Sequence, residues 1–158
     1  MLFRYSIVLP LLISLIGGCS GIKTYPNSPI KNLHVEVETD ADSLFSSVRA
    51  AVDIYRVDSY CKTEYEGTVQ FKYPSVDLGI PPGRSSYLVF VYTRSSFLSN
   101  STGTVRYDVL LTPHPAYKYN AKVRYVDNIY NVEISEIQPD SGKIREIELK
   151  GLNTCHAY

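Results

Sequence analysis

The stretch YKYNAKVRYVDNIYNVEIS, residues 117–135, decides the fold, because apolar and polar side chains alternate on both sides of Asp127-Asn128. A period of two is typical of a half-buried β-strand, and an Asp-Asn pair between two such runs suits a two-residue turn. The cross-strand pairs that follow are Val126 with Ile129, Tyr125 with Tyr130, Val123 with Val132 and Lys122 with Glu133. Apolar side chains meet on one face and opposite charges on the other, so the stretch predicts an antiparallel hairpin.

A second turn at Asp140-Ser141 extends this hairpin by one more strand. The pairs that it predicts are Glu136 with Arg145, Ile134 with Ile147 and Val132 with Leu149. A shift of one residue would place Ile134 opposite Glu148, so the alternation specifies the register. We therefore predict an antiparallel meander over residues 117–150, with one apolar face and one charged face.

The same period runs through most of the chain before this meander. Predicted strands cover residues 33–38, 48–55, 68–73, 87–93 and 104–112, and residues 40–47 are either a plain connection or one helical turn. Residues 87–93 are apolar on both sides, which indicates a strand with both faces covered. The prediction is an all-β, two-layer antiparallel β-sandwich of about eight strands, immunoglobulin-like or transthyretin-like, with an eight-stranded barrel as its rival.

The first residues of the chain show an export pattern. Arg4 precedes an apolar run from Ile7 to Ile16, which at about ten residues is too short to span a bilayer. The run ends in LIGGC, residues 15–19, which resembles the lipobox of bacterial lipoproteins. That resemblance implies cleavage before Cys19, a diacylglycerol thioether on its sulfur and a further acyl chain on the new N-terminus. An ordinary secretory peptide, in which Cys19 is incidental, is the alternative.

Ser20 bears on the membrane that would hold this anchor. In the lipoprotein class an aspartate at this position marks retention in the inner membrane, so Ser20 implies the outer membrane, with the domain facing the periplasm. Residues 20–31 contain Gly21, Pro26 and Pro29 and no apolar periodicity. The predicted organisation is a signal peptide over residues 1–18, a lipidated tether over residues 19–31 and a β-sandwich domain over residues 32–158.

Two cysteines remain once Cys19 is assigned to lipid. An even pair in an exported protein predicts a disulfide, here between Cys61 and Cys155. Two free thiols or an intermolecular bond are the alternatives. A metal site would need more ligands than Cys61, Cys155 and His156 supply, so we expect no metal.

Charge and motifs exclude several classes of function. Removing residues 1–18 takes Arg4 from 16 basic residues and leaves 15 against 16 acidic ones, which argues against nucleic acid as a partner. The histidines lack ligand spacing, and the chain contains neither a Gly-x-Ser-x-Gly elbow nor a phosphate loop or dinucleotide fingerprint. Glu133, Glu146 and Glu148 are explained as a solvated face around Lys122. We therefore expect no enzyme and no cofactor; a weak hydrolase would need two carboxylates that converge in a cleft.

What remains is the surface of the domain. Lys118, Asn120, Lys122 and Arg124 share the outward face of one strand and form the predicted contact face for another envelope protein, although a plain solvated face explains them as well. The chain has 14 tyrosines and no tryptophan, and Tyr55, Tyr92 and Tyr107 are candidates for the surface. The expected function is non-enzymatic docking or assembly in the cell envelope; a glycan or peptidoglycan-binding module is the alternative. Docking requires an exposed apolar patch or an open sheet edge, whereas glycan stacking requires at least two coplanar tyrosines on a concave face.

Overall fold

The computed structural model describes residues 21–39, 46–71, 74–96, 101–126 and 129–156. The lipobox with Cys19, most of the 40–47 connection and the turn at residues 127–128 lie outside these ranges. The described residues form β1 (Leu33–Thr39), β2 (Ser46–Val57), β3 (Thr63–Gln70), β4 (Ser75–Leu78), β5 (Ser86–Ser96), β6 (Ser101–Leu111), β7 (Lys118–Val126), β8 (Ile129–Ile137), β9 (Ile144–Glu146) and a short 3-10 helix, η2 (Leu152–Thr154).

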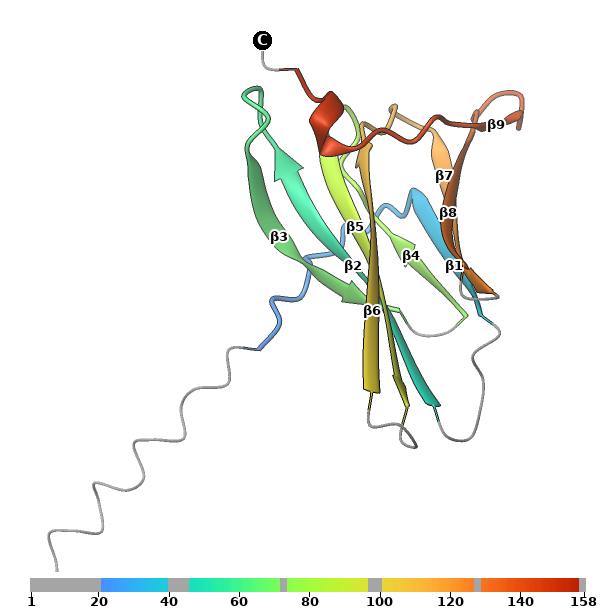
Figure 1. Ribbon diagram of the computed structural model, residues 1–158. Helices are drawn as coiled ribbons and strands as arrows, with labels where there is room; N and C mark the ends of the chain where they lie inside the picture. Colours follow the sequence, from blue (N-terminus) through green and yellow to red (C-terminus); the bar gives the residue numbers. More distant parts are fainter. Residues whose placement is uncertain (1–20, 40–45, 72–73, 97–100, 127–128, 157–158) are drawn as a thin grey trace, which may run out of the picture.

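The strands form two sheets that pack face to face, which confirms the β-sandwich (Figure 1). Sheet A has the order β3-β2-β5-β6, and sheet B has the order β4-β1-β7-β8-β9. Between the described strands, all pairings are antiparallel except that of β1 with β7, which runs parallel from Leu33 opposite Tyr119 to Thr39 opposite Tyr125. The sequence did not predict this parallel pair, because the alternation in β1 is the same whichever way its neighbour runs.

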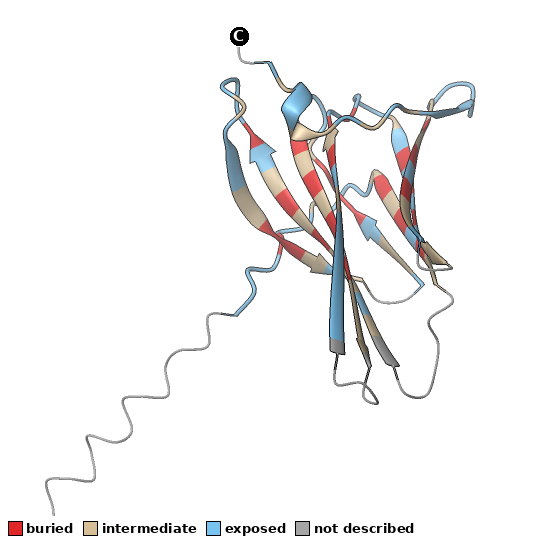
Figure 2. Ribbon diagram, in the orientation of Figure 1, coloured by how far each residue is buried: buried red, intermediate tan, exposed pale blue. Residues whose placement is uncertain are grey.

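The core lies between the sheets, where the apolar halves of the alternating strands meet (Figure 2). In β7 the alternation is complete, since Tyr119, Ala121 and Val123 are buried and the residues between them are exposed. Facing them from sheet A are fully buried side chains of β2, β5 and β6, namely Val52, Ile54, Leu88, Phe90 and Val109. The period of two therefore sorts the side chains into core and surface as the sequence predicts.

The meander has the predicted register from β7 through β9. Lys122 lies opposite Glu133, Tyr125 opposite Tyr130, and Glu136 opposite Arg145. The Ile147 amide also donates to the Ile134 carbonyl at 3.0 Å. The predicted pairing of Val132 with Leu149 is wrong, because β9 ends at Glu146 and the chain crosses to sheet A, where the Leu110 amide donates to the Lys150 carbonyl at 2.6 Å.

The apolar strand β5 lies inside sheet A, but only one of its faces belongs to the core. Leu88, Phe90 and Tyr92 are buried, whereas Tyr87 and Val89 on the other face are half-buried. The prediction of cover on both faces is therefore wrong within the described part of the chain. The outer side chains are shielded by their neighbours in the same sheet instead, as where Tyr87 packs against Tyr55 with ring centroids 5.8 Å apart.

The predicted tether is part of the folded domain from Lys23 onward. Thr24 pairs with Thr68 of β3 as an isolated parallel bridge. The Tyr25 amide donates to the Thr68 carbonyl at 3.1 Å, and the Thr68 amide donates to the Lys23 carbonyl at 2.8 Å. Tyr25 is buried, and its hydroxyl donates to the Gly79 carbonyl at 3.1 Å. A side chain at Gly67 would come within 2.5 Å of the Tyr25 nitrogen, so this contact requires glycine. The boundary expected at residues 31 and 32 thus moves to about residue 23.

Candidate docking surfaces

The predicted contact face lies on the outer side of sheet B. Lys118, Asn120, Lys122 and Arg124 are all exposed on β7, as the alternation predicts. They lie between β1 on one side and β8 on the other, with Lys122 opposite Glu36 and Glu133. Because the pairing of β1 with β7 is not local in the sequence, the acidic neighbours from β1 could not be predicted.

These neighbours change the electrostatic character of the face. Glu38 of β1 lies 3.1 Å from the Arg124 Nε and 3.7 Å from the Lys122 Nζ. Glu36 and Glu133 flank Lys122 as well, so the cations of β7 sit among carboxylates. The face is mixed in sign rather than basic, and exposed pairs of this kind contribute about 0–1 kcal/mol each to stability.

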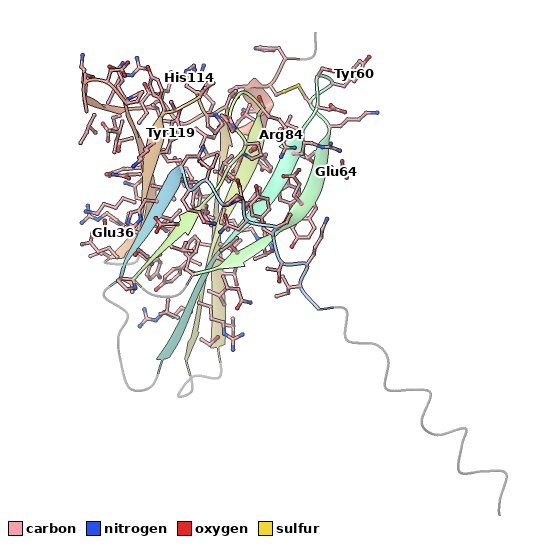
Figure 3. The ribbon with its side chains drawn as sticks, turned by 180° about the vertical axis from the view of Figure 1, so that it is seen from behind. Glu36, Tyr60, Glu64, Arg84, His114 and Tyr119 are labelled. Atoms are coloured by element: carbon pink, nitrogen blue, oxygen red, sulfur yellow. A yellow bond between two sulfur atoms is a disulfide. The ribbon has the colours of Figure 1, made fainter. Side chains whose placement is uncertain are left out.

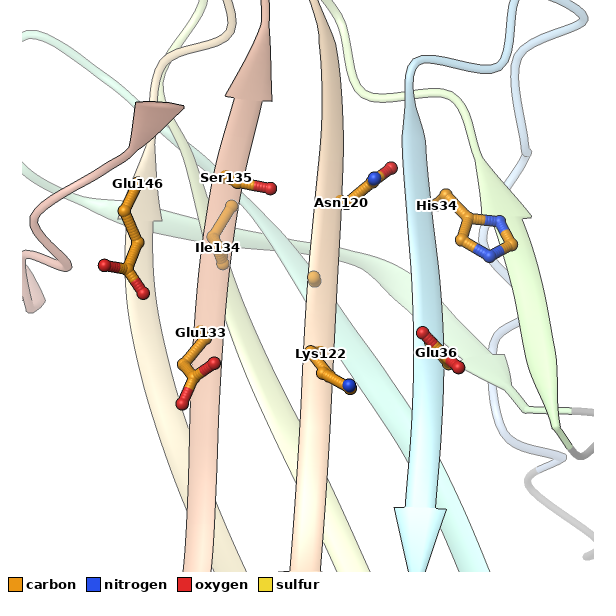
Figure 4. Close-up of a pocket in the computed structure, with 9 residues that line it drawn as sticks. His34, Glu36, Asn120, Lys122, Glu133, Ile134, Ser135 and Glu146 are labelled. Carbon is orange, nitrogen blue, oxygen red and sulfur yellow. The ribbon is translucent and has the colours of Figure 1, made fainter. Parts of the chain in front are cut away.

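A shallow groove of about 260 Å³ crosses the same face (Figure 4). Two cross-strand rows line it: Glu36, Lys122 and Glu133 form one row, and His34, Asn120, Ser135 and Glu146 form the other. His34 Nδ1 lies 2.7 Å from Asp77 Oδ1, and the Asn131 side-chain Nδ2 donates to Glu133 Oε1 at 2.9 Å. Ala121 and Ile134 form the floor between these polar side chains, and the lining contains no Phe, Tyr or Trp ring. The groove therefore lacks the stacking surface that a sugar ring would use.

The disulfide between Cys61 and Cys155 is confirmed, with the two Cα atoms 5.9 Å apart (Figure 3). Cys61 lies in the turn between β2 and β3, where Asp58 Oδ1 accepts the Tyr60 and Lys62 amides at 2.9 Å each. Cys155 directly follows η2. The C-terminal segment crosses from sheet B past β6, and the disulfide ties it to the β2–β3 turn of sheet A.

The outer face of sheet A carries a row of tyrosines. Tyr55 lies between Tyr65 and Tyr87, with ring centroids 5.3 and 5.8 Å away. The ring planes are tilted by 53° and 54°, so these three rings do not form the coplanar platform that glycan stacking requires. Burial and the nearby Asp108 carboxylate raise the pKa of Tyr87, and burial and Asp53 raise that of Tyr55. Tyr55 and Tyr87 therefore remain protonated donors at neutral pH.

The other tyrosine candidates point into the sandwich. Tyr92 is only 1% exposed and stacks on Tyr125 with ring centroids 4.5 Å apart. Tyr107 is half-buried and meets Tyr130 edge-on. The surface position considered for Tyr92 is therefore wrong, because this residue occupies a core position of β5. Burial strongly raises the pKa of Tyr130, whose hydroxyl has no hydrogen-bond partner among the described residues.

The sequence did not single out the outer edge of β6, which is the clearest open feature of the domain. β6 pairs with β5 in one unbroken register from Ser101 to Leu111. The Leu110 amide points away from β5, toward Lys150, so the amides and carbonyls of every second residue before it also point outward. These residues are Thr102, Thr104, Arg106 and Asp108, all of them exposed (Figure 2).

No backbone hydrogen bond reaches these four residues on the outer side of β6 within the described ranges, although Gly151 and Leu152 of the C-terminal segment lie near Arg106 and Asp108. The strand contains neither a proline nor a break in its register, which are two common means of protecting an edge. Val105, on the inward side, is 38% exposed. Such an edge offers a regular template for another β-strand. The sequence signal that could have indicated this long strand is the run of residues 101–111, which contains no proline and ends before Pro113.

The described residues hold no group of three or more His, Cys, Asp or Glu side chains placed to bind a metal ion. Within the same ranges, no helix has the length and apolar character needed to cross a membrane. Comparisons with protein-family models, curated proteins and solved structures find no match to this chain.

Proposed function

We propose that this chain is a lipoprotein, held in the outer membrane by lipid on Cys19, whose domain faces the periplasm and docks another envelope protein without catalysis. The lipobox-like residues 15–19 support the anchor, and Ser20 supports the outer membrane. Lipidation with two or more acyl chains holds a protein stably on a bilayer. The pair Cys61 and Cys155, which is disulfide-bonded, suits an oxidising compartment such as the periplasm.

The open edge of β6 is the observation that carries the docking part of the proposal. A partner that contributes an extended segment would add a strand beside β6, and its backbone would bond to Thr102, Thr104, Arg106 and Asp108. In this mode the main-chain hydrogen bonds supply affinity and the alternating side chains supply specificity. Val105 and Tyr107 favour β-branched residues on one side of that segment, whereas Arg106 and Asp108 favour charged residues on the other.

The polar groove on sheet B gives less support to catalysis than the β6 edge gives to docking. Its histidine is paired with Asp77, and its central lysine lies among Glu36, Glu38 and Glu133. Charges that satisfy one another on an exposed sheet face are typical of a solvated surface. A docking role needs only the exposed backbone groups of β6.

The proposal predicts the behaviour of Cys19→Ser. The wild-type chain should fractionate with membranes and co-purify with a defined protein after detergent extraction, because the acyl chains keep it on the bilayer beside its partner. Cys19→Ser should lose the lipid mass and leave the membrane fraction, or remain unprocessed. Ser20→Ala is the matched control and should retain the anchor. Unchanged membrane retention and mature mass in Cys19→Ser would refute the anchor, and a glycan in place of a protein among the co-purified material would refute docking.

A further inference from the structure

The docked N-terminal segment, residues 21–31, leaves little free chain between the proposed anchor and the domain. The bridge to β3 begins with the Lys23 carbonyl, which accepts the Thr68 amide at 2.8 Å. Only Ser20, Gly21 and Ile22 separate Lys23 from Cys19. Four residue steps span at most about 14 Å even in a fully extended chain. The lipid would therefore hold the domain close to the bilayer by one particular side.

That side is the seam between β3 and β4. The N-terminal segment starts on β3 at Thr68 and continues to β4, where the Asn27 side chain bonds to the Asp77 carbonyl at 3.1 Å and to the Gly79 amide at 2.7 Å. Figure 3, viewed from behind, shows the segment running over this side of the molecule. Since β3 and β6 are the two edges of sheet A, the segment lies on the side opposite the open β6 edge.

The chemistry of the N-terminal segment suits a lipid surface. Residues 21–31 contain Lys23 and Lys31 and no acidic residue. Ile22 and Ile30 are 64% and 77% exposed; Ile129 and Ile144 on sheet B are as exposed, but only Ile22 and Ile30 each lie directly beside a lysine of the N-terminal segment. Exposed aliphatic side chains beside lysines are typical of protein surfaces that rest on anionic headgroups.

The neighbouring carboxylates do not cancel this charge. Glu64 pairs with Arg56, Glu66 accepts two hydrogen bonds from Arg84 at 2.8 and 2.9 Å, and Asp77 of β4 lies 2.7 Å from His34 Nδ1. Lys23 donates to the Tyr65 carbonyl at 3.2 Å, a neutral group that leaves its charge in place. The β3–β4 seam thus keeps the positive charge of its two lysines next to the expected position of the lipid.

We propose that the β3–β4 seam, covered by residues 21–31, is the surface by which the domain rests on an anionic phospholipid bilayer. The inference rests on the proposed lipidation of Cys19. Ile22 and Ile30 face the interface, Lys23 and Lys31 meet the headgroups, and the β6 edge is directed away from the membrane. The anchor therefore orients the domain as well as retaining it, and it leaves the docking edge accessible to a partner in the periplasm.

The test uses the full lipidated chain in vesicles of phosphatidylethanolamine and phosphatidylglycerol that contain lipids with a nitroxide quencher on the headgroup. An environment-sensitive fluorescent amino acid replaces Ile30 in one variant and Val105, an exposed aliphatic residue on the far edge, in another. We expect blue-shifted emission and a large loss of fluorescence at residue 30, and little change at residue 105. Combining Lys23→Glu with Lys31→Glu should reduce the quenching at residue 30 without releasing the protein, whereas Lys118→Glu with Lys143→Glu, on exposed residues away from the seam, should not.

The outcomes separate this inference from the anchor on which it rests. A chain that does not associate with the vesicles refutes lipidation at Cys19 and the orientation together. A chain that is anchored but is quenched equally at residues 30 and 105, or more at residue 105, refutes the orientation alone and leaves the anchor standing. Equal effects of the two lysine pairs would also contradict the assignment of the seam.

Discussion

Replacing Cys61 and Cys155 by Ser is expected to lower the free energy of unfolding by about 4 kcal/mol, because the bond closes a loop with a sequence separation of 94 residues. Without it the unfolded chain gains conformational entropy. The native state also loses the tie between the β2–β3 turn and the segment after η2. Urea unfolding of the wild-type chain and the double variant, followed by circular dichroism, measures the difference.

Reduction of the wild-type chain is the matched control for that experiment, and it should reproduce the loss of stability without any change of sequence. A difference below about 1 kcal/mol, within the range of an ordinary surface substitution, would contradict the structural role of the bond. Two thiols that react with an alkylating agent in protein freshly taken from the envelope would show that the bond does not form in the cell.

Tyr25→Ala is expected to lower the free energy of unfolding by about 3–5 kcal/mol, the usual cost of removing a large buried aromatic side chain. Tyr25 is 5% exposed, and its ring packs in the core cluster. Tyr25→Phe keeps the ring and loses only the hydrogen bond to the Gly79 carbonyl, so it should cost about 1 kcal/mol. Urea unfolding of the three chains measures both effects.

The comparison of these two variants locates the start of the folded domain. If Tyr25→Ala is as stable as the wild type, residues 23–31 are a tether, as the sequence predicts, and the orientation on the bilayer loses its basis. A large loss in Tyr25→Ala with a small one in Tyr25→Phe places the N-terminal segment inside the cooperative unit. Thr24→Ala, an exposed substitution on the same segment that keeps the backbone bridge, should change little.

Local pattern was enough to predict the β7–β8 hairpin. Each side chain there has a partner a few residues away, so the pairing of Lys122 with Glu133 follows from the position of the turn. The same arithmetic gave the pairing of Glu136 with Arg145. It was wrong beyond Ile147, because the chain leaves sheet B there to join β6, and no local period indicates which sheet a strand belongs to.

Contacts between distant segments could not be predicted in this way. The alternation of Leu33, Val35 and Val37 is the same beside a parallel or an antiparallel neighbour, so the pairing of β1 with β7 is invisible in it. Tyr25 lies in a segment rich in proline and glycine, where a single buried ring produces no period. In β5, an apolar pattern on both faces does not distinguish a covering layer from shielding by neighbouring strands.

Only part of the candidate site could be predicted, because contacts between distant segments leave no local pattern. The outward direction of Lys118, Asn120, Lys122 and Arg124 follows from the period of β7. The Glu38 carboxylate that faces Arg124 does not, since it comes from β1. The open edge of β6 depends on which strand ends sheet A, and that is a property of the whole topology.

Docking at the β6 edge is tested most directly by comparing how Thr104→Pro and Thr104→Ala co-purify with the partner from detergent-solubilised membranes. Proline at residue 104 removes an amide that points away from β5, so it leaves the β5–β6 ladder intact while it removes one outward donor. We expect Thr104→Pro to lose the partner and Thr104→Ala to retain it, with both chains folded and anchored. Lys122→Gln combined with Arg124→Gln, on the other sheet, should also retain the partner. Full retention by Thr104→Pro, or loss in the β7 variant alone, would contradict docking at β6.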